Sequence, residues 1–262
     1  MAPWIAATGA VFLWWFLTGA ILVAVRRAGS SGLRLTLAGL PLLAGGAGLV
    51  ALSLRDPSIA GVLMAFGGAL CVWGWVELAF LAGTITGWER RPCPPGLAGR
   101  ARFERAFAAV GWHELALAAG ALALTLASAG APNRVALATY LILFLARITA
   151  KLNLYFGVPR INEVFLPDRL AYLASYFRRG PVTWAFPVAV TLLTALLAVC
   201  AERLWWASDP ATVVGYALLT TLAALALLEH WLMVIPLPDA KLWAWMLPSR
   251  PPARPQGDDR GL

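Results

Sequence analysis

Residues 211–235 read ATVVGYALLTTLAALALLEHWLMVI, an almost unbroken apolar run whose only acidic or basic side chains, Glu229 and His230, stand near its end. A helix needs about 20 mostly apolar residues to cross the hydrocarbon core of a bilayer. This run is long enough, and it lacks the alternation of apolar and polar residues that is typical of membrane β-strands. The stretch therefore predicts a transmembrane α-helix.

Six further runs of the same kind stand earlier in the chain. They cover residues 4–25, 35–54, 59–84, 107–127, 135–155 and 182–201. Of the 262 residues, 60% are hydrophobic and only 13% are charged, whereas about a quarter of the residues in a soluble domain are charged. We therefore predict an all-α, polytopic transmembrane helical bundle of seven spans, with residues 1–247 forming a single transmembrane domain.

Basic residues gather in alternate loops. The loops after the first, third and fifth runs and the C-terminal segment contain Arg26, Arg27, Arg34, Arg90, Arg91, Arg100, Arg102, Arg105, Arg160, Arg169, Arg178, Arg179, Lys241, Arg250, Arg254 and Arg260. The loops between them contain one each, Arg55, Arg134 and Arg203. Because Lys and Arg accumulate in cytoplasmic loops, this pattern predicts an N-terminus outside and a C-terminus in the cytoplasm. The net charge of +8 then reflects topology, and we expect membrane lipid as a partner rather than nucleic acid.

Two basic segments outside the spans have apolar residues at helical spacing. In residues 167–179 these are Leu170, Leu173 and Phe177, and residues 238–247 have a similar pattern. We predict that both segments are amphipathic helices on the cytoplasmic membrane surface. The Pro-rich and charged residues 248–262 predict a disordered cytoplasmic tail.

The second span contains a group of glycines, Gly45, Gly46 and Gly48. Small residues let the backbones of two membrane helices approach closely. We therefore expect this stretch to pack tightly against a neighbouring helix.

Ionisable side chains stand inside four of the predicted spans, all near the cytoplasmic ends. They are Glu77, His113, Glu114, Arg147, Lys151, Glu229 and His230. Each lies four to eight residues from the end of its span, or roughly 6–12 Å deep at a rise of about 1.5 Å per residue. Charged groups are costly in a bilayer and often mark functional sites. We therefore take these seven residues as a candidate polar cluster that could bind a cofactor.

The residues alone leave several roles for this cluster open. Three carboxylates and four basic groups nearly balance, so a buried ion network that only orients the helices is one. His113 and His230 could instead ligate the metal of a tetrapyrrole such as bacteriochlorophyll, because Ala109 and Ala226 each leave space one turn away. A mixed carboxylate and imidazole metal site, a proton relay and an anion site at Arg147 and Lys151 are the other readings. The metal is left open. We assign no catalytic residue, because no nucleotide-binding or serine hydrolase motif is present.

Four strings resemble a known family in the same order. They are Thr86-Gly87-Trp88, Cys93-Pro94-Pro95-Gly96, Trp112-His113-Glu114-Leu115-Ala116 and residues 150–178, AKLNLYFGVPRINEVFLPDRLAYLASYFR. The chain resembles the PuhE-type photosynthetic complex assembly proteins of phototrophic bacteria, over roughly residues 86–247.

The resemblance implies a multi-pass factor of the bacterial cytoplasmic (inner or intracytoplasmic) membrane that assists assembly of the photosynthetic reaction centre and its core light-harvesting antenna. Reaction-centre or core antenna polypeptides would then be its partners, and it could assist bacteriochlorophyll delivery. No catalytic residues are carried over, and a non-enzymatic role is favoured. The alternative is a membrane enzyme or carrier that uses the polar cluster on a tetrapyrrole or an isoprenoid. The oligomeric state stays open.

Overall fold

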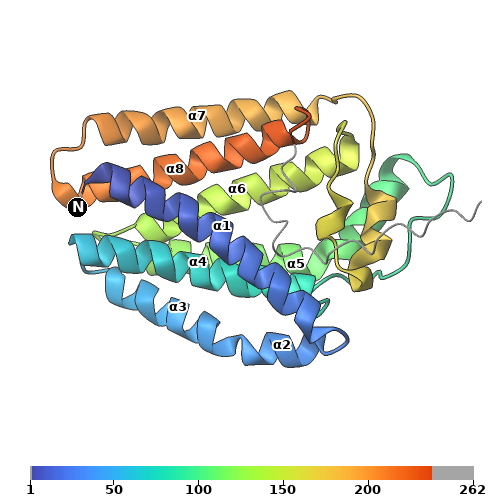
Figure 1. Cartoon of the computed structure of the whole chain (residues 1–262), viewed down its shortest axis with the longest axis horizontal. Coiled ribbons are helices and arrows are strands. Elements are labelled where there is room, and N and C mark those ends of the chain that lie inside the picture. The colour runs from blue at the N-terminus through green and yellow to red at the C-terminus, as the bar shows by residue number, and fades with distance from the viewer. Residues whose placement is uncertain (1, 238–262) are drawn as a thin grey trace, which may run out of the picture.

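The computed structural model describes residues 2–237, and within them seven helical spans are long and apolar enough to cross a membrane. They lie side by side along the long axis of the molecule (Figure 1). The spans are α1 (Pro3–Ala28), the pair α2 (Gly32–Ala38) and α3 (Leu40–Ser53), α4 (Ile59–Leu81), α5 (Gly99–Ala127), α6 (Val135–Phe156), α7 (Ala185–Trp205) and α8 (Pro210–Leu232). The prediction of an all-α bundle with seven spans is confirmed.

The second span is interrupted at Gly39, where the sequence predicts a continuous run. Pro41 stands just beyond this point, and a proline has no N–H with which to bond the carbonyl of Leu37 one turn earlier. Trp75 of α4 donates its indole N–H to the carbonyl of Thr36 beside the break, at 3.1 Å. The local sequence therefore explains the break between α2 and α3, and a side chain of α4 donates to one of the backbone carbonyls beside it.

Helix α8 lies at the centre of the bundle, where it contacts α1, α4, α6 and α7. Half of its most apolar stretch is buried, a larger share than in any other span. Val214, Leu218 and Leu222 of α8 pack in one apolar cluster with Phe66 of α4 and Ile142 of α6. Because α4, α6 and α8 contact one another, polar side chains on their inward faces are brought close together.

Helices α3 and α4 meet at a glycine contact. A Cβ atom added at Gly46 would lie 2.7 Å from the Cβ of Cys71 and 2.9 Å from the carbonyl oxygen of Gly68. The expectation of close packing is confirmed for Gly46. It is wrong for Gly45 and Gly48, whose added Cβ atoms would meet nothing within 4 Å, because both face away from α4.

The longest connections lie at the end of the bundle opposite the N-terminus (Figure 1). They join α4 to α5 and α6 to α7, and the short turn between α1 and α2 lies at the same end. We call residues 26–34, 82–105 and 157–184 the basic end, since most of the arginines of the described part of the chain lie there. The side of the membrane that this end faces stays a prediction.

The connection between α6 and α7 contains two 3₁₀ helices, η1 (Glu163–Phe165) and η2 (Asp168–Tyr176). Helix η2 falls within residues 167–179, which the sequence predicts as a membrane-surface helix. Its Leu170 and Leu173 are buried against Phe80 of α4 and Ala109 of α5. The apolar face of η2 thus covers the ends of two spans, and its contact with lipid stays a prediction. The second predicted surface segment, 238–247, and the tail, 248–262, lie outside the described residues.

The segment after α4 runs directly against α5. The backbone N–H of His113 donates to the carbonyl of Thr86 at 2.9 Å. A Cβ atom at Gly87 would collide with the backbone of α5, and one at Gly111 would collide with the ring of Trp88. Only glycine allows this approach at either position. Two strings that are far apart in the sequence, 86–88 and 112–116, are therefore in contact.

Candidate functional site: an ion chain inside the bundle

Five of the seven predicted residues form one continuous chain of contacts across three helices. Glu114 of α5 pairs with Lys151 of α6, and the Lys151 ammonium lies 2.7 Å from Nδ1 of His113. Nε2 of His113 faces the Glu77 carboxylate of α4 at 3.5 Å, and the second oxygen of Glu77 pairs with Arg147 of α6. We call these five residues the ion chain. Its order is Glu114, Lys151, His113, Glu77 and Arg147.

Helix geometry explains why α6 supplies both cations. Arg147 and Lys151 are four residues apart, so their side chains leave the same face of the helix one turn from each other. That face is turned toward α4 and α5, where the carboxylates of Glu77 and Glu114 stand. Each cation therefore has its own carboxylate, and His113 lies between the two pairs.

The hydrogen bonds around His113 assign its tautomer. An ammonium can only donate, so Nδ1 of His113 accepts from Lys151. The ring proton of a neutral imidazole then sits on Nε2, which points at the Glu77 carboxylate. With a neutral His113, two carboxylates face two cations, and the ion chain carries no net charge.

An aromatic ring covers the middle of the ion chain. The ring of Phe80 lies 4.2 Å from that of His113, measured between centroids. The Lys151 ammonium lies 5.4 Å and the Arg147 guanidinium 5.9 Å from the centroid of the same ring. A cation within about 6 Å of an aromatic face is attracted to it. Phe80 therefore interacts with both cations and shields His113, which is fully buried.

The other two predicted residues stand outside this chain. His230 of α8 is buried, with Nδ1 2.8 Å from the carbonyl of Ala226 and Nε2 2.9 Å from the hydroxyl of Thr149. Glu229 accepts from the indole N–H of Trp14 of α1 at 2.8 Å. The structure thus brings five of the candidates together and gives these two separate partners.

This geometry limits what the histidines can bind. Both nitrogens of His230 have protein partners, and Nδ1 of His113 is occupied by Lys151. The other nitrogen of His113, Nε2, faces the Glu77 carboxylate inside the bundle. A tetrapyrrole metal would have to displace these contacts. Within residues 2–237, no three His, Cys, Asp or Glu side chains are placed to hold a metal ion.

Three residues that contact these side chains were not among the seven candidates predicted from the sequence. Phe80 covers the ion chain, Thr149 binds His230, and Trp14 binds Glu229. Trp14 gives a signal that could have been used, because it stands in the middle of a span whereas tryptophans usually gather at the ends. Phe80 and Thr149 are ordinary residues of apolar helices, so only the packing reveals their contacts.

Comparison with known proteins now adds the family. A profile described as "Protein of unknown function (DUF3623)" matches residues 1–254. The chain belongs to the DUF3623 family. A curated protein of Rhodobacter capsulatus, named "Uncharacterized 30.4 kDa protein in puhA 5'region", is 47% identical over 251 residues. That alignment covers 94% of this DUF3623 chain and 92% of the relative. No solved structure is significantly similar to this chain.

Proposed function

We propose that this protein is a membrane-embedded assembly factor for the photosynthetic reaction centre and its core light-harvesting complex. The observation that carries the proposal is the relative of Rhodobacter capsulatus, which is named for its position in the puhA 5' region. Its identity of 47% extends over nearly the whole of both chains. The strings that resemble PuhE-type assembly proteins point to the same role.

The arrangement of these strings supports a role in binding other polypeptides. Three of the four strings lie wholly or partly at the basic end, and the fourth, residues 112–116, lies just beyond it in α5 and contacts the string 86–88. The backbone N–H of Cys93 donates to the hydroxyl of Ser175 at 2.8 Å, and the hydroxyl of Tyr176 donates to the carbonyl of Arg91 at 3.0 Å. Together with the buried contact between Thr86 and His113, these bonds hold the strings together beneath one surface of the basic end. We propose that reaction-centre or core antenna polypeptides contact this surface.

The ion chain then has a structural role in the proposal. Its charges are matched one to one, and each of its end residues, Glu114 and Arg147, is paired inside the protein. Paired charges of this kind fix the rotation and depth of the helices that carry them. The alternative is an enzyme or carrier that uses the ion chain on a tetrapyrrole or an isoprenoid, and the second experiment below separates the two.

The first test is a deletion of the gene in a phototrophic host. We expect assembled reaction-centre and core antenna complexes to fall severalfold in membrane absorption spectra, because their assembly would lose a factor. Extracted bacteriochlorophyll precursors should still be made. A copy of the gene supplied in trans is the control and should restore the spectra. Normal levels of both complexes in the deletion strain would contradict the proposal.

The second test asks whether the protein binds bacteriochlorophyll. The protein is purified in mild detergent and its absorption spectrum is recorded, alongside His113→Ala and His230→Ala variants. We expect no bacteriochlorophyll band, since neither imidazole presents a nitrogen to an open site. A stoichiometric band that disappears in one histidine variant and stays in the other would instead establish a pigment carrier.

A further inference from the structure

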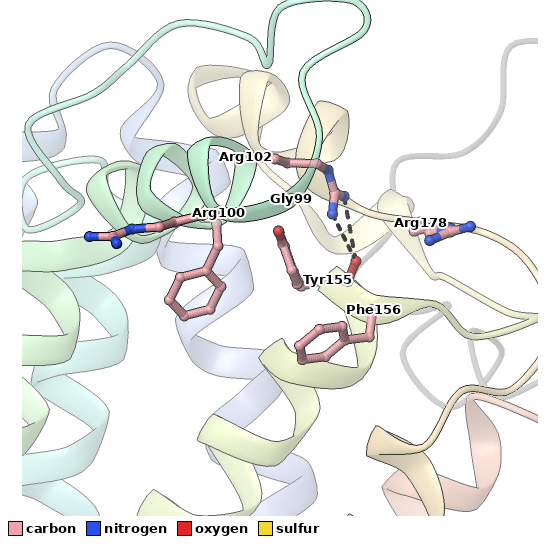
Figure 2. A pocket seen from close by; sticks show the side chains of 7 residues that line it. Gly99, Arg100, Arg102, Tyr155, Phe156 and Arg178 are labelled. Atoms are coloured by element: carbon pink, nitrogen blue, oxygen red, sulfur yellow. Dashed lines mark hydrogen bonds between the residues drawn. The ribbon is translucent and has the colours of Figure 1, made fainter.

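A pocket of about 440 Å³ opens at the basic end, where the first turns of α5 meet the last turn of α6. None of its residues belongs to the ion chain. Three aromatic rings and three arginines make up nearly all of its lining, which consists of Gly99, Arg100, Arg102, Phe103, Tyr155, Phe156 and Arg178. Figure 2 shows Tyr155 and Phe156 below Arg102, with Arg100 and Arg178 on opposite sides of the opening.

The aromatic wall of the pocket is a connected set of rings. Tyr155 packs edge-on against Phe103 at 5.7 Å and against Phe156 at 5.1 Å, measured between ring centroids. Phe156 in turn lies 4.8 Å from Trp184, whose side chain is exposed. Exposed tryptophans and tyrosines at helix ends are typical of the boundary between hydrocarbon and headgroups. Trp184, the N-cap residue of α7, fits this pattern.

The three arginine side chains differ in how firmly contacts with the protein hold them. The guanidinium of Arg102 donates to the carbonyl of Tyr176 at 2.7 Å and lies 4.1 Å above the ring of Tyr155, so it is fixed. Arg100 pairs at 2.6 Å with Glu104, and both side chains are in contact with solvent, where such pairs are weak. Arg178 is exposed, and its side chain makes no hydrogen bond or ion pair with any of residues 2–237. It is therefore free to bind an anion.

The start of α5 adds to the positive potential. Its N-cap residue, Ala98, has no side chain that accepts from the first N–H groups, and the first turn contains no acidic residue. The N-terminus of a helix carries a partial positive charge and unpaired N–H donors, which favour anions. The lining residues include three arginines and no acidic side chain, and the pair of Arg100 with Glu104 is the one ion pair that a lining residue makes with the described residues.

We propose that this pocket binds the phosphodiester headgroup of an anionic phospholipid. Arg178 and Arg100 contact the phosphate, and Arg102 holds the wall in place. The glycerol and the first acyl carbons lie along Phe103 and Phe156. A soluble phosphate would use the arginines but not the apolar rings of the wall. This site goes beyond the assembly role, since it binds lipid whatever polypeptide the basic end contacts.

The test measures phospholipid retention by native mass spectrometry after purification in detergent with equal amounts of phosphatidylglycerol and phosphatidylcholine. The variant is Arg100→Gln/Arg178→Gln, which removes the two mobile cations and keeps Arg102. We expect its phosphatidylglycerol retention to fall on the order of tenfold, because each basic residue near an anionic headgroup contributes severalfold to affinity. The matched control is Arg55→Gln, an exposed arginine at the opposite end of the bundle, and it should retain phosphatidylglycerol like the wild type.

A second arm distinguishes a lipid from a free phosphate. Inorganic phosphate is added to the wild type at millimolar concentration, and we expect no loss of phosphatidylglycerol, because a free anion lacks the contact with the aromatic wall. Displacement of the lipid by inorganic phosphate would overturn the assignment to a phospholipid. Equal retention by the double variant and by Arg55→Gln would overturn the site itself. Circular dichroism of each variant checks that the helical bundle is intact.

Discussion

At the scale of single residues, the ion chain depends on Glu77. Among the described residues, Glu77 is the only carboxylate that contacts both His113 and Arg147, and it comes from a different helix than either of them. A charge that loses its partner inside a protein costs far more free energy than an exposed one, because no water replaces the lost contact. The ion chain is therefore most sensitive to changes at this position.

We predict that Glu77→Gln lowers the free energy of unfolding by about 3–5 kcal/mol, since it leaves Arg147 without a carboxylate inside the bundle. The measurement is thermal unfolding in detergent, followed by tryptophan fluorescence. Glu104→Gln is the control, because its ion pair with Arg100 is exposed and such pairs are worth about 0–1 kcal/mol. A double variant, Glu77→Gln/Arg147→Met, should recover part of the loss. Equal stability of Glu77→Gln and Glu104→Gln would refute the structural role of the ion chain.

At the scale of elements, the contact between α3 and α4 depends on which side of α3 each glycine faces. Gly46 lies against Gly68 and Cys71 of α4, whereas Gly45 faces away from the neighbouring helices. The two glycines are adjacent in sequence and have the same intrinsic cost in a helix. They differ only in what a side chain would meet.

We therefore predict opposite effects for two neighbouring substitutions. Gly46→Ala should destabilise the protein by about 1–3 kcal/mol, because its Cβ forces α3 and α4 apart. Gly45→Ala should be neutral or slightly stabilising, because alanine favours helix and meets nothing there. Thermal unfolding of the two variants in the same detergent gives the comparison. If Gly45→Ala were the more damaging of the two, the register of α3 against α4 would be wrong.

At the scale of the whole molecule, the seven spans place the N-terminus at one end of the bundle and the long connections at the other. The connections that make up the basic end contain most of the arginines, whereas the opposite end has Arg55 and Arg134 in its loops and Arg203 in the last turn of α7. Because positively charged loops stay in the cytoplasm, the basic end should face that compartment. Both the proposed partner surface and the proposed lipid pocket would then face the cytoplasm.

Reporter fusions measure this sidedness. Alkaline phosphatase joined after Pro132, in the loop between α5 and α6, should be active because that loop would lie outside. The same reporter joined after Gly180, in the basic end, should be inactive, while green fluorescent protein at that site should fluoresce. The reverse pattern would place the basic end outside. It would contradict the prediction that the partner surface and the lipid pocket face the cytoplasm.

The sequence by itself was sufficient for the number of spans and for most of their limits. The apolar length of a run such as residues 211–235 is a local property, and so is the position of arginines in the loops between runs. The predicted run 59–84 ends a few residues beyond the end of α4, and α5 begins before the predicted 107–127 because its first two turns are polar. The depth of roughly 6–12 Å stays a prediction, because it follows only from the rise per residue of a helix.

Only the tertiary structure decided which polar residues meet. Seven ionisable side chains stand at a similar depth, yet the ion chain includes His113 and Glu77, while His230 binds Thr149 and Glu229 binds Trp14. The rotation of each helix about its axis selects these partners, and packing against neighbouring helices sets that rotation. For the same reason, the proposed lipid pocket could not be predicted from the sequence. Its lining comes from α5, α6 and the segment after η2, which become neighbours only when the bundle folds.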